Sequence, residues 1–470
     1  MSSDATQLTE AEAAQLLEDL ALGEDYALTS DYVEMVIDAA DRGDGMRLRE
    51  LISALHPADV ADLLGFLSAE HRDEVVPWLP PDLLAETLPE LDDGVREDVL
   101  ESIDPGALAE ALQELDSDDA TGIVEDLEDD QRRAVLAAMP EAERAGIENA
   151  LLYAEDSAGR LMQREVMAAP QFWSVGHAID HMRGQADDLP ELFFDIYVVD
   201  PSQRPVGAIP VSGLLRAARE VLLTDLMEPI TEIAVDTEQE EVAYIFEKYH
   251  LISAPVIDKG GRLVGQITVD DIVNIIQEEN QEDMLALAGV TDAGRDADVA
   301  EVVRSRIPWL VVNLGTALVA SMVIGFFQAE IQQLVALAVL MPVVASIGGN
   351  AGTQALTVSV RALAMRELSA ANAWRILRRE IAVGLLNGTA IAALLAGVTW
   401  LWQRDVMLST VIGSAVVINL FAAALAGTLA PLALDRLGRD PAVASPVFVS
   451  WVTDTIGFLA FLGLAALILL

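Results

Sequence analysis

Five long apolar segments lie beyond residue 306 of this chain. They cover residues 307–327, 331–355, 381–402, 408–434 and 442–470, and the second continues to about residue 364. Each is long enough to cross about 30 Å of hydrocarbon as a helix. One such segment could be a buried core helix, but five in succession predict an all-α membrane domain over residues 304–470.

Arginines are distributed unevenly among the connections between these segments. Arg304 and Arg306 precede the first segment, five arginines follow the second and two follow the fourth, whereas the loop at 328–333 has none and the loop after the third has only Arg404. Positively charged connections stay on the cytoplasmic side. The pattern predicts a multi-pass protein of the plasma membrane with cytoplasmic N-terminal domains. Because five is odd, it also predicts an extracytoplasmic C-terminus.

Two polar features lie inside the apolar segments. Asp454, the only ionisable residue after Asp440, falls near the middle of the fifth segment. A carboxylate at this depth is costly unless it meets water, a cation or a polar partner such as an interhelical hydrogen bond. In the second segment, residues 348–354 read Gly-Gly-Asn-Ala-Gly-Thr-Gln. They indicate either close helix packing or a broken or pinched helix that lines a water-filled path.

The donor atoms available in the spans limit the kind of cation. The chain has no Cys, and no His follows residue 250, so the side-chain ligands in the spans are oxygen atoms. Oxygen donors suit Mg²⁺ or Ca²⁺ better than Zn²⁺ or Cu⁺. One carboxylate per chain suits a largely hydrated Mg²⁺, held through its waters by two Asp454 across a dimer axis.

Negative charge is concentrated before the membrane domain. Residues 1–300 hold 68 of the 76 acidic residues, and the whole chain has only two lysines, Lys248 and Lys259. This charge excludes a nucleic-acid partner, because it repels phosphate. The composition is similar to that of proteins from salt-accumulating haloarchaea, in which surface acids keep the protein hydrated. Most of the acids then serve solvation, and a few remain as candidates for metal sensing.

A twelve-residue repeat runs through the part of the chain that follows an N-terminal tail at 1–30. Apolar residues recur at this interval, and Pro or Asp often follows them, as at the start of a short helix. The repeat predicts a small α-solenoid over residues 31–156. The recurring residues are Leu55, Leu67, Leu79, Leu91, Ile103, Leu115, Leu127 and Met139.

Two β-rich repeats follow, about 60 residues apart. Strand–turn–strand patterns at 194–211 and 253–271 resemble a pair of CBS domains, at 157–222 and 223–276, with residues 264–271 as the better match. The resemblance implies that Asp271 contacts the ribose of an adenine nucleotide such as ATP. The first repeat has Ser212 and Gly213 at the corresponding place. The alternative is a regulatory module that binds no nucleotide.

The full order of segments resembles the MgtE family of magnesium transporters. An acidic helical repeat, two CBS domains, a connecting plug-like helix at 277–303 and five spans carry this likeness, together with residues 157–162, 348–354 and 440–442. It implies a homodimeric, channel-like Mg²⁺ transporter with its pore on the dimer axis. It also implies that Asp454 holds the hydrated ion, helped by backbone near Ser450. The residues expected to line the pore are Gly349, Asn350, Thr353 and Pro446.

The resemblance further implies that cytoplasmic Mg²⁺ bridges acids and closes the pore. One matching acid is Asp271 in the second CBS domain, and Glu240 matches a CBS-dimer ligand. The other matching acids are Glu279, Glu282 and Asp283 of the connecting helix, and Asp118 and Asp119 of the helical repeat.

Two alternative functions remain open at this stage. One is transport of another divalent cation, such as Co²⁺ or Mn²⁺. The other is a membrane-anchored CBS sensor that conducts nothing, although such an anchor has no need of Asp454 or of residues 348–354. An enzymatic function is not expected, because no P-loop, nucleophile–base pair or His/Cys metal cluster is evident.

Overall fold

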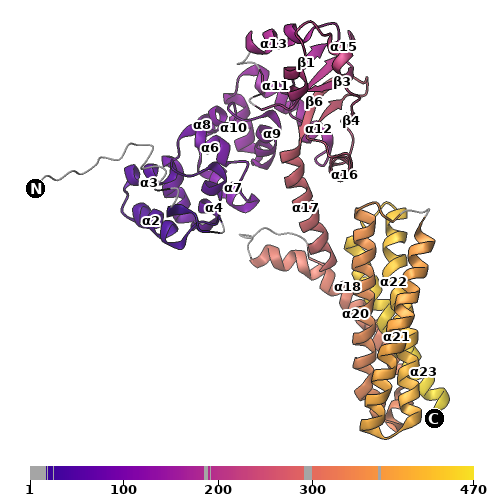
Figure 1. Cartoon of the computed structure of the whole chain (residues 1–470). Helices are drawn as coiled ribbons and strands as arrows, with labels where there is room; N and C mark the ends of the chain where they lie inside the picture. Colours follow the sequence, from indigo (N-terminus) through magenta and orange to yellow (C-terminus); the bar gives the residue numbers. More distant parts are fainter. Residues whose placement is uncertain are drawn as a thin grey trace, which may run out of the picture. The chain divides into compact units, whose positions relative to one another are not determined.

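A computed structural model describes residues 17, 20–24, 26–184, 189–190, 192–290, 299–368 and 372–469. Figure 1 labels its helices and strands. Contacts divide the chain into two units, one ending at Ile276 and the other beginning at Gln277. The first unit contains a helical part and the two β-rich repeats. The second contains the end of a connecting helix and the apolar helices.

Short helices stack along the N-terminal part, as the twelve-residue repeat predicts. Each recurring apolar residue lies in a connection between helices, and its side chain packs into one common core. Leu115 is partly buried in this core, and the other recurring residues are at most 9% exposed. Pro57, Pro81 and Pro105 occupy first turns, where their missing N–H costs no hydrogen bond. The α-solenoid is therefore confirmed. Its elements are α2 (Ser30–Asp41), α3 (Gly45–Ile52), α4 (Pro57–Phe66), α5 (Ala69–Val75), η1 (Val76–Trp78), α6 (Pro81–Thr87), α7 (Asp93–Ser102), α8 (Pro105–Ala111), α9 (Ser117–Asp126), α10 (Asp129–Ala138) and α11 (Glu141–Ala150).

The two β-rich repeats have the same topology, which confirms the α+β pair. In each, a short strand pairs in parallel with a second strand, which pairs antiparallel with a third. Asp200 and Asp258 close the equivalent hairpins by accepting hydrogen bonds from backbone N–H groups of the turn. The first repeat contains β1 (Ala168–Pro170), α13 (Val175–Gly184), β2 (Asp195–Val199), β3 (Pro205–Pro210), α14 (Val211–Arg216) and α15 (Leu223–Leu226); the second contains β4 (Ile233–Ala234), α16 (Gln239–Tyr249), β5 (Ser253–Ile257), β6 (Leu263–Thr268) and the start of α17 (Val269–Leu287).

The segment around α12 (Ala158–Leu161) joins the helical part to the second repeat, although it precedes the first in sequence. Ala158 and Met162 lie in the core of the second repeat, and Gln163 pairs with Gln266 of β6. On its other side, Arg160 pairs with Glu125 of α9 and donates to the backbone carbonyl oxygens of Leu151 and Tyr153. The segment thus ties α9 to the second repeat.

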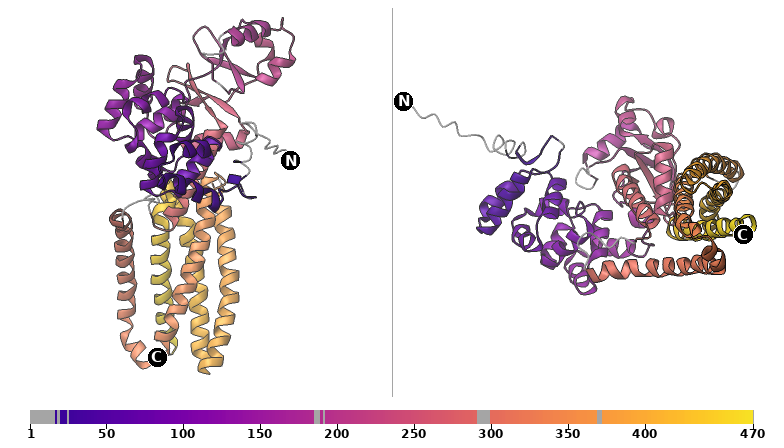
Figure 2. Two further views of the ribbon diagram at one scale, coloured as in Figure 1. Left: turned by 90° about the vertical axis from the view of Figure 1, so that its left-hand side faces the viewer. Right: turned by 90° about the horizontal axis from the view of Figure 1, so that it is seen from below.

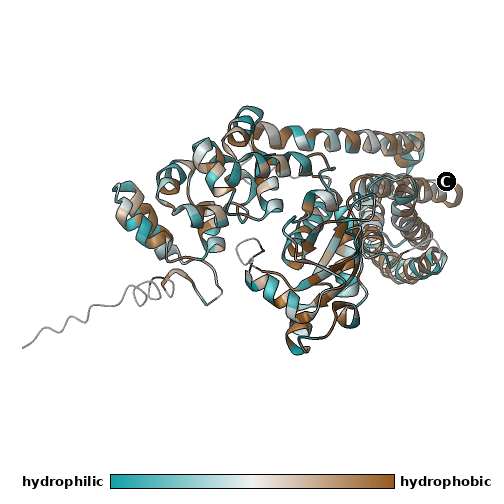
Figure 3. Ribbon diagram, turned by 90° about the horizontal axis from the view of Figure 1, so that it is seen from above, coloured by the Kyte–Doolittle hydropathy of each residue, from teal (hydrophilic) through white to brown (hydrophobic). Residues whose placement is uncertain are grey.

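Long apolar helices form a bundle in the second unit, and Figure 2 shows α20 to α23 side by side. Five of its helices are long and apolar enough to cross a membrane, which agrees with the five predicted spans. Apolar residues dominate along these helices, whereas polar and apolar residues alternate in the N-terminal helices (Figure 3). The elements are α18 (Val299–Phe326), α19 (Gln328–Gln333), α20 (Ala336–Ala364), α21 (Ala373–Gln403), α22 (Val406–Arg436) and α23 (Pro441–Ile468).

Helix α22 is the centre of this bundle. It packs against α20, α21 and α23, and most of its apolar stretch is buried. Helix α18 packs chiefly on α23 and leaves most of its surface uncovered by its own chain. A helix that is apolar all round and uncovered in one chain must be covered by lipid or by a second chain.

Replacement of Arg160 by Met should loosen the junction between α9 and the second repeat. The Arg160 side chain is 9% exposed, so its loss leaves Glu125 and two carbonyl groups without a partner. Breaking a buried pair in this way costs about 3–5 kcal/mol. Hydrogen exchange of the full-length protein in detergent should show faster exchange in α9 and α12. Arg133→Met is the matched control, because the exposed pair of Arg133 and Asp130 contributes under about 1 kcal/mol. Equal exchange in the two variants would contradict this role of Arg160.

Candidate metal centre and ion pathway

Acidic residues of α9 lie close to the start of α17 within the first unit. Burial raises the pKa of Asp118 well above its usual range, and the nearby Asp271 raises it further. Burial raises the pKa of Asp119 to about 7, and the charge of Asp271 is the next largest cause. Among the described residues, one carboxyl oxygen of Asp118, Oδ1, is buried without a hydrogen-bond partner. The main charges of the described chain that shift the pKa values of Asp118, Asp119 and Asp271 are all acidic.

Asp271 is held by the first turn of α17. Its Oδ2 accepts a hydrogen bond from Oγ1 of Thr268 at 2.9 Å. Burial raises the pKa of Asp271 to about 6, and Asp270 adds to the rise, while the bond from Thr268 opposes it. The structure therefore places Asp271 beside both predicted acids of the helical part. A divalent cation would supply the positive charge that this group lacks.

A second acidic group lies in the second unit, around Asp283 near the end of α17. Burial raises the pKa of Asp283 to about 6, and the next largest contribution comes from Asp440, followed by Glu279 and Glu282. Asp440 caps α23, where its Oδ1 accepts a hydrogen bond from the backbone N–H of Ala442 at 2.7 Å. Three acids predicted on the connecting helix are thus brought together with a fourth, from the start of the fifth span.

Asp440 is not among the metal ligands predicted from the sequence. It forms an Asp-Pro pair ahead of an apolar run, and this pattern is typical of a helix N-cap. Only the folding of α17 against the bundle brings Asp440 near Asp283. Ala286 at the end of α17 packs among buried residues of α20, α22 and α23, including Val360, Ala430 and Ala442.

The donor set of both acidic groups fits a hydrated cation. In the described ranges of the chain, no three Asp, Glu or His side chains converge tightly enough to hold a bare metal ion. Mg²⁺ keeps several of its waters and uses one or two carboxylates, so loosely facing acids suit it. Glu240, predicted as a CBS-dimer ligand, lies elsewhere, exposed in the first turn of α16.

Asp454 lies on a partly covered face of α23. It is neither buried nor fully exposed, and it makes no hydrogen bond or ion pair with the described residues of its own chain. The interhelical hydrogen bond considered as an alternative is therefore not observed. Ser450, one turn earlier, is exposed, and its backbone carbonyl accepts from Oγ1 of Thr453 at 3.0 Å. Pro446, a further turn away, is partly exposed.

Helix α20 runs without interruption through residues 348–354. The expectation of a broken or pinched helix is wrong, because close packing of glycines accommodates the segment within a continuous helix. Gly348 and Gly352 face the bundle, while Asn350 and Thr353 are exposed on the opposite side. Gly349 has open space around it, and its carbonyl accepts from Oγ1 of Thr353 at 3.1 Å. Two of the predicted pore residues, Asn350 and Thr353, thus lie on a face of α20 that the described helices of the chain leave uncovered.

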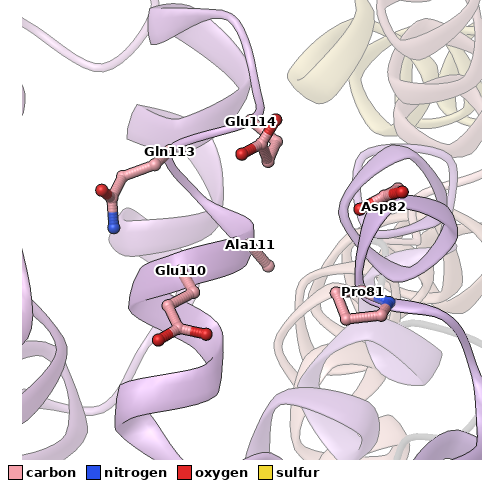
Figure 4. Close-up of a pocket in the computed structure, with 6 residues that line it drawn as sticks. All are labelled: Pro81, Asp82, Glu110, Ala111, Gln113 and Glu114. Atoms are coloured by element: carbon pink, nitrogen blue, oxygen red, sulfur yellow. The ribbon is translucent and has the colours of Figure 1, made fainter.

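A groove of about 260 Å³ lies in the helical part, between α6 and the end of α8. Figure 4 shows Asp82 on one side of this groove and Glu110 and Glu114 on the other. None of these acids belongs to the predicted sensing residues. Because these acids are also negatively charged, they serve as a control for the acids of α9 and α17 when the effect of removing charge is measured.

Comparison with known proteins defines the class. The model of a family described as divalent cation transporters matches residues 341–464, which include the exposed face of α20 and Asp454. A model of the MgtE intracellular N domain matches residues 55–156, and a CBS domain model matches residues 223–278.

Two individual relatives cover most of the chain. The magnesium transporter MgtE of Thermus thermophilus is 34% identical over 446 residues, which is 92% of this chain and 97% of the relative. The magnesium transporter MgtE of Bacillus subtilis is 31% identical over 333 residues, or 70% of this chain and 73% of the relative. The chain therefore belongs to the MgtE family of magnesium transporters. A solved cytosolic domain of the Mg²⁺ channel MgtE in complex with ATP is 32% identical, covers 52% of this chain and 99% of its own, and has a TM-score of 0.49.

The acids around Asp271 should make the first unit sensitive to pH when Mg²⁺ is absent. Their pKa values are raised above the ordinary value of 3.8, to about 7 for Asp119 and about 6 for Asp271. The folded state therefore binds more protons than the unfolded state between these values, and stability falls as pH rises through them. Hydrogen exchange in α9 should speed up between pH 5.5 and 7.5 at fixed KCl, beyond its intrinsic pH dependence. Added Mg²⁺ should flatten this trend, and Asp119→Asn should reduce it. A trend that is unchanged by both would show that these carboxyl groups do not titrate in this range.

Proposed function

We propose that this chain moves Mg²⁺ across the plasma membrane into the cytoplasm, and that cytoplasmic Mg²⁺ closes the pathway. The observation that carries the proposal is Asp454, a carboxylate in the interior of a membrane-spanning helix that has no hydrogen-bond or ion-pair partner among the described residues of its own chain. Such a group needs water or a cation. Membership of the MgtE family supports Mg²⁺ as that cation, since its relatives are named as magnesium transporters.

The pathway is proposed to lie between two copies of the chain. Asn350 and Thr353 of α20 are exposed in a single chain, and Asp454 of α23 is partly so. A second copy would enclose these faces and bring two Asp454 carboxylates to one axis. Two carboxylates can hold a hydrated Mg²⁺ through its water molecules without stripping them, and this allows the ion to leave again. The arginine pattern supports a cytoplasmic N-terminal part and an extracytoplasmic C-terminus.

Closure is proposed to follow from the two acidic groups. Without a divalent cation, the carboxylates around Asp271 and around Asp283 repel one another. Mg²⁺ between them favours the compact arrangement, and a ligand that binds one state more tightly shifts the population toward it. Because α17 ends against α20, α22 and α23, a change in α17 reaches the helices that carry the predicted pore residues.

An adenine nucleotide is the proposed further ligand of the CBS pair. Asp271 follows β6 and is oriented by Thr268, in the repeat that matches the CBS model. A nucleotide there would use the same carboxylate as the acidic group. No reaction is assigned to this chain, whose relatives are named as transporters.

Asp454→Ala should abolish most Mg²⁺ transport. With the carboxylate gone, nothing in the described part of the span offers negative charge to the ion, so flux into proteoliposomes should fall at least about tenfold. Asp435→Asn, an exposed acid in the last turn of α22, is the control and should transport normally. Repeating the assay with Co²⁺, Mn²⁺ and Ca²⁺ tests the alternative cargo. Equal flux in wild type and Asp454→Ala would refute the pathway, and no flux in either would favour a non-conducting sensor.

Asp271→Ala combined with Glu282→Ala should leave transport active at high cytoplasmic Mg²⁺. Removing one carboxylate from each acidic group lowers the preference of Mg²⁺ for the compact state, so the closing concentration should rise about tenfold. The matched control is Glu110→Ala with Glu114→Ala, which removes the same charge from the groove in Figure 4. An equal shift in both double variants would assign the effect to overall surface charge. Normal closure in the first variant would refute the sensing role.

A further inference from the structure

Asn419 is a fully buried polar residue of α22 that the proposed pathway does not use. Its exposed fraction is 0%, and its Nδ2 donates a hydrogen bond to the backbone carbonyl oxygen of Val344 on α20 at 3.0 Å. Its Oδ1 has no hydrogen-bond partner among the described residues. A buried acceptor without a partner costs free energy, and an apolar side chain of similar volume would avoid that cost. The amide is therefore poorly explained by stability alone.

Two glycines on different helices make room for this side chain. A Cβ atom added to Gly348 of α20 would lie 2.0 Å from Nδ2 of Asn419, and one added to Gly457 of α23 would lie 2.7 Å from the same atom. Both distances are shorter than ordinary carbon contacts, so a Cβ at either place would force the Asn419 side chain to move. The amide of Asn419 thus fills the space between α20 and α23, which pack against α22 in the bundle (Figures 1 and 2).

The contact lies at the level of the predicted pore residues. Gly348 directly precedes Gly349, and Gly457 lies three residues after Asp454, which places it on a neighbouring part of the same helix surface. One turn further along α20, an added Cβ at Gly352 would lie 2.5 Å from Cγ1 of Val449 on α23. Together these contacts set the distance between the two helices and their rotation.

We infer that Asn419 is a positioning residue of the ion pathway. Through its bond to Val344 and its fit between Gly348 and Gly457, it fixes the spacing of α20 and α23. It thereby places Asp454 relative to the face that carries Gly349 and Asn350. The inference rests on the proposed function, but the geometric part can be measured without transport.

The transport test uses variants of both contact partners. Asn419→Leu keeps the volume and removes the hydrogen bond, so Mg²⁺ flux into proteoliposomes should fall about tenfold and discrimination between Mg²⁺ and Ca²⁺ should weaken. Gly348→Ala alone should impair flux, because its Cβ meets the Asn419 amide. Asn419→Ala frees that space, so the double variant should recover flux relative to Gly348→Ala. Gly397→Ala on α21 is the control, since an added Cβ there meets nothing within 4 Å.

A cross-linking test measures the geometry itself. The chain has no cysteine, and an added Cβ at Gly352 lies 3.3 Å from Cγ2 of Thr453, so Gly352→Cys with Thr453→Cys falls within disulfide reach. Because the same Cβ would lie 2.5 Å from Cγ1 of Val449, every protein in this comparison also carries Val449→Ala, which removes that atom. Addition of Asn419→Leu to this pair should slow disulfide formation about fivefold. If Asn419→Leu changes neither the cross-linking rate nor the ion discrimination, the inference is overturned. The inference is also overturned if Asn419→Leu lowers thermal stability while the protein that remains folded discriminates normally between Mg²⁺ and Ca²⁺. If wild type carries no Mg²⁺, the proposed function fails, and the cross-linking rate alone decides whether Asn419 positions the helices.

Discussion

Carboxyl groups that lie where charge is costly are the feature on which this structure depends. Asp454 has no hydrogen-bond or ion-pair partner in the described part of the chain, and Asp118, Asp119 and Asp271 approach one another with raised pKa values. Each arrangement costs free energy as it stands, because an ionised carboxyl group is stable when it faces water or positive charge. In the proposed function, a divalent cation compensates both costs. The same ion can therefore act as cargo at one place and as a signal at another.

Close helix packing makes the membrane part specific. In hydrocarbon, helices gain little from burying apolar surface, so small residues that allow backbones to approach decide which helices meet. Gly348 and Gly352 bring α20 against α22 and α23 on one side. The opposite side of α20 then remains free for Asn350 and Thr353. One short stretch of sequence thus serves packing and, in the proposed function, conduction, through two faces of one continuous helix.

Most of the large negative charge is compatible with solvation, while a small part has a structural position that solvation does not explain. Asp82, Glu110 and Glu114 border an open groove. Burial raises the pKa of Asp118 and Asp119, by contrast, and a residue that serves only to hold water would not be placed there. Position rather than number separates the sensing candidates from the surface acids.

The elements and their order could be predicted from the amino-acid sequence. A twelve-residue interval fixed the stacked helices, five apolar runs fixed the spans, and duplicated strand patterns fixed the paired repeats, because these patterns depend on local periodicity. Asp454 could also be identified from the sequence, because a single ionisable residue in a long apolar segment is evident without knowledge of its neighbours in space.

Which distant residues meet became known from the folded chain alone. It brought Asp440 to Asp283, Asp271 to the acids of α9, and Asn419 between two glycines. It also showed that α20 is not broken. Contacts across tens or hundreds of residues leave no periodic trace in a single sequence, because they arise from the packing of whole helices against one another.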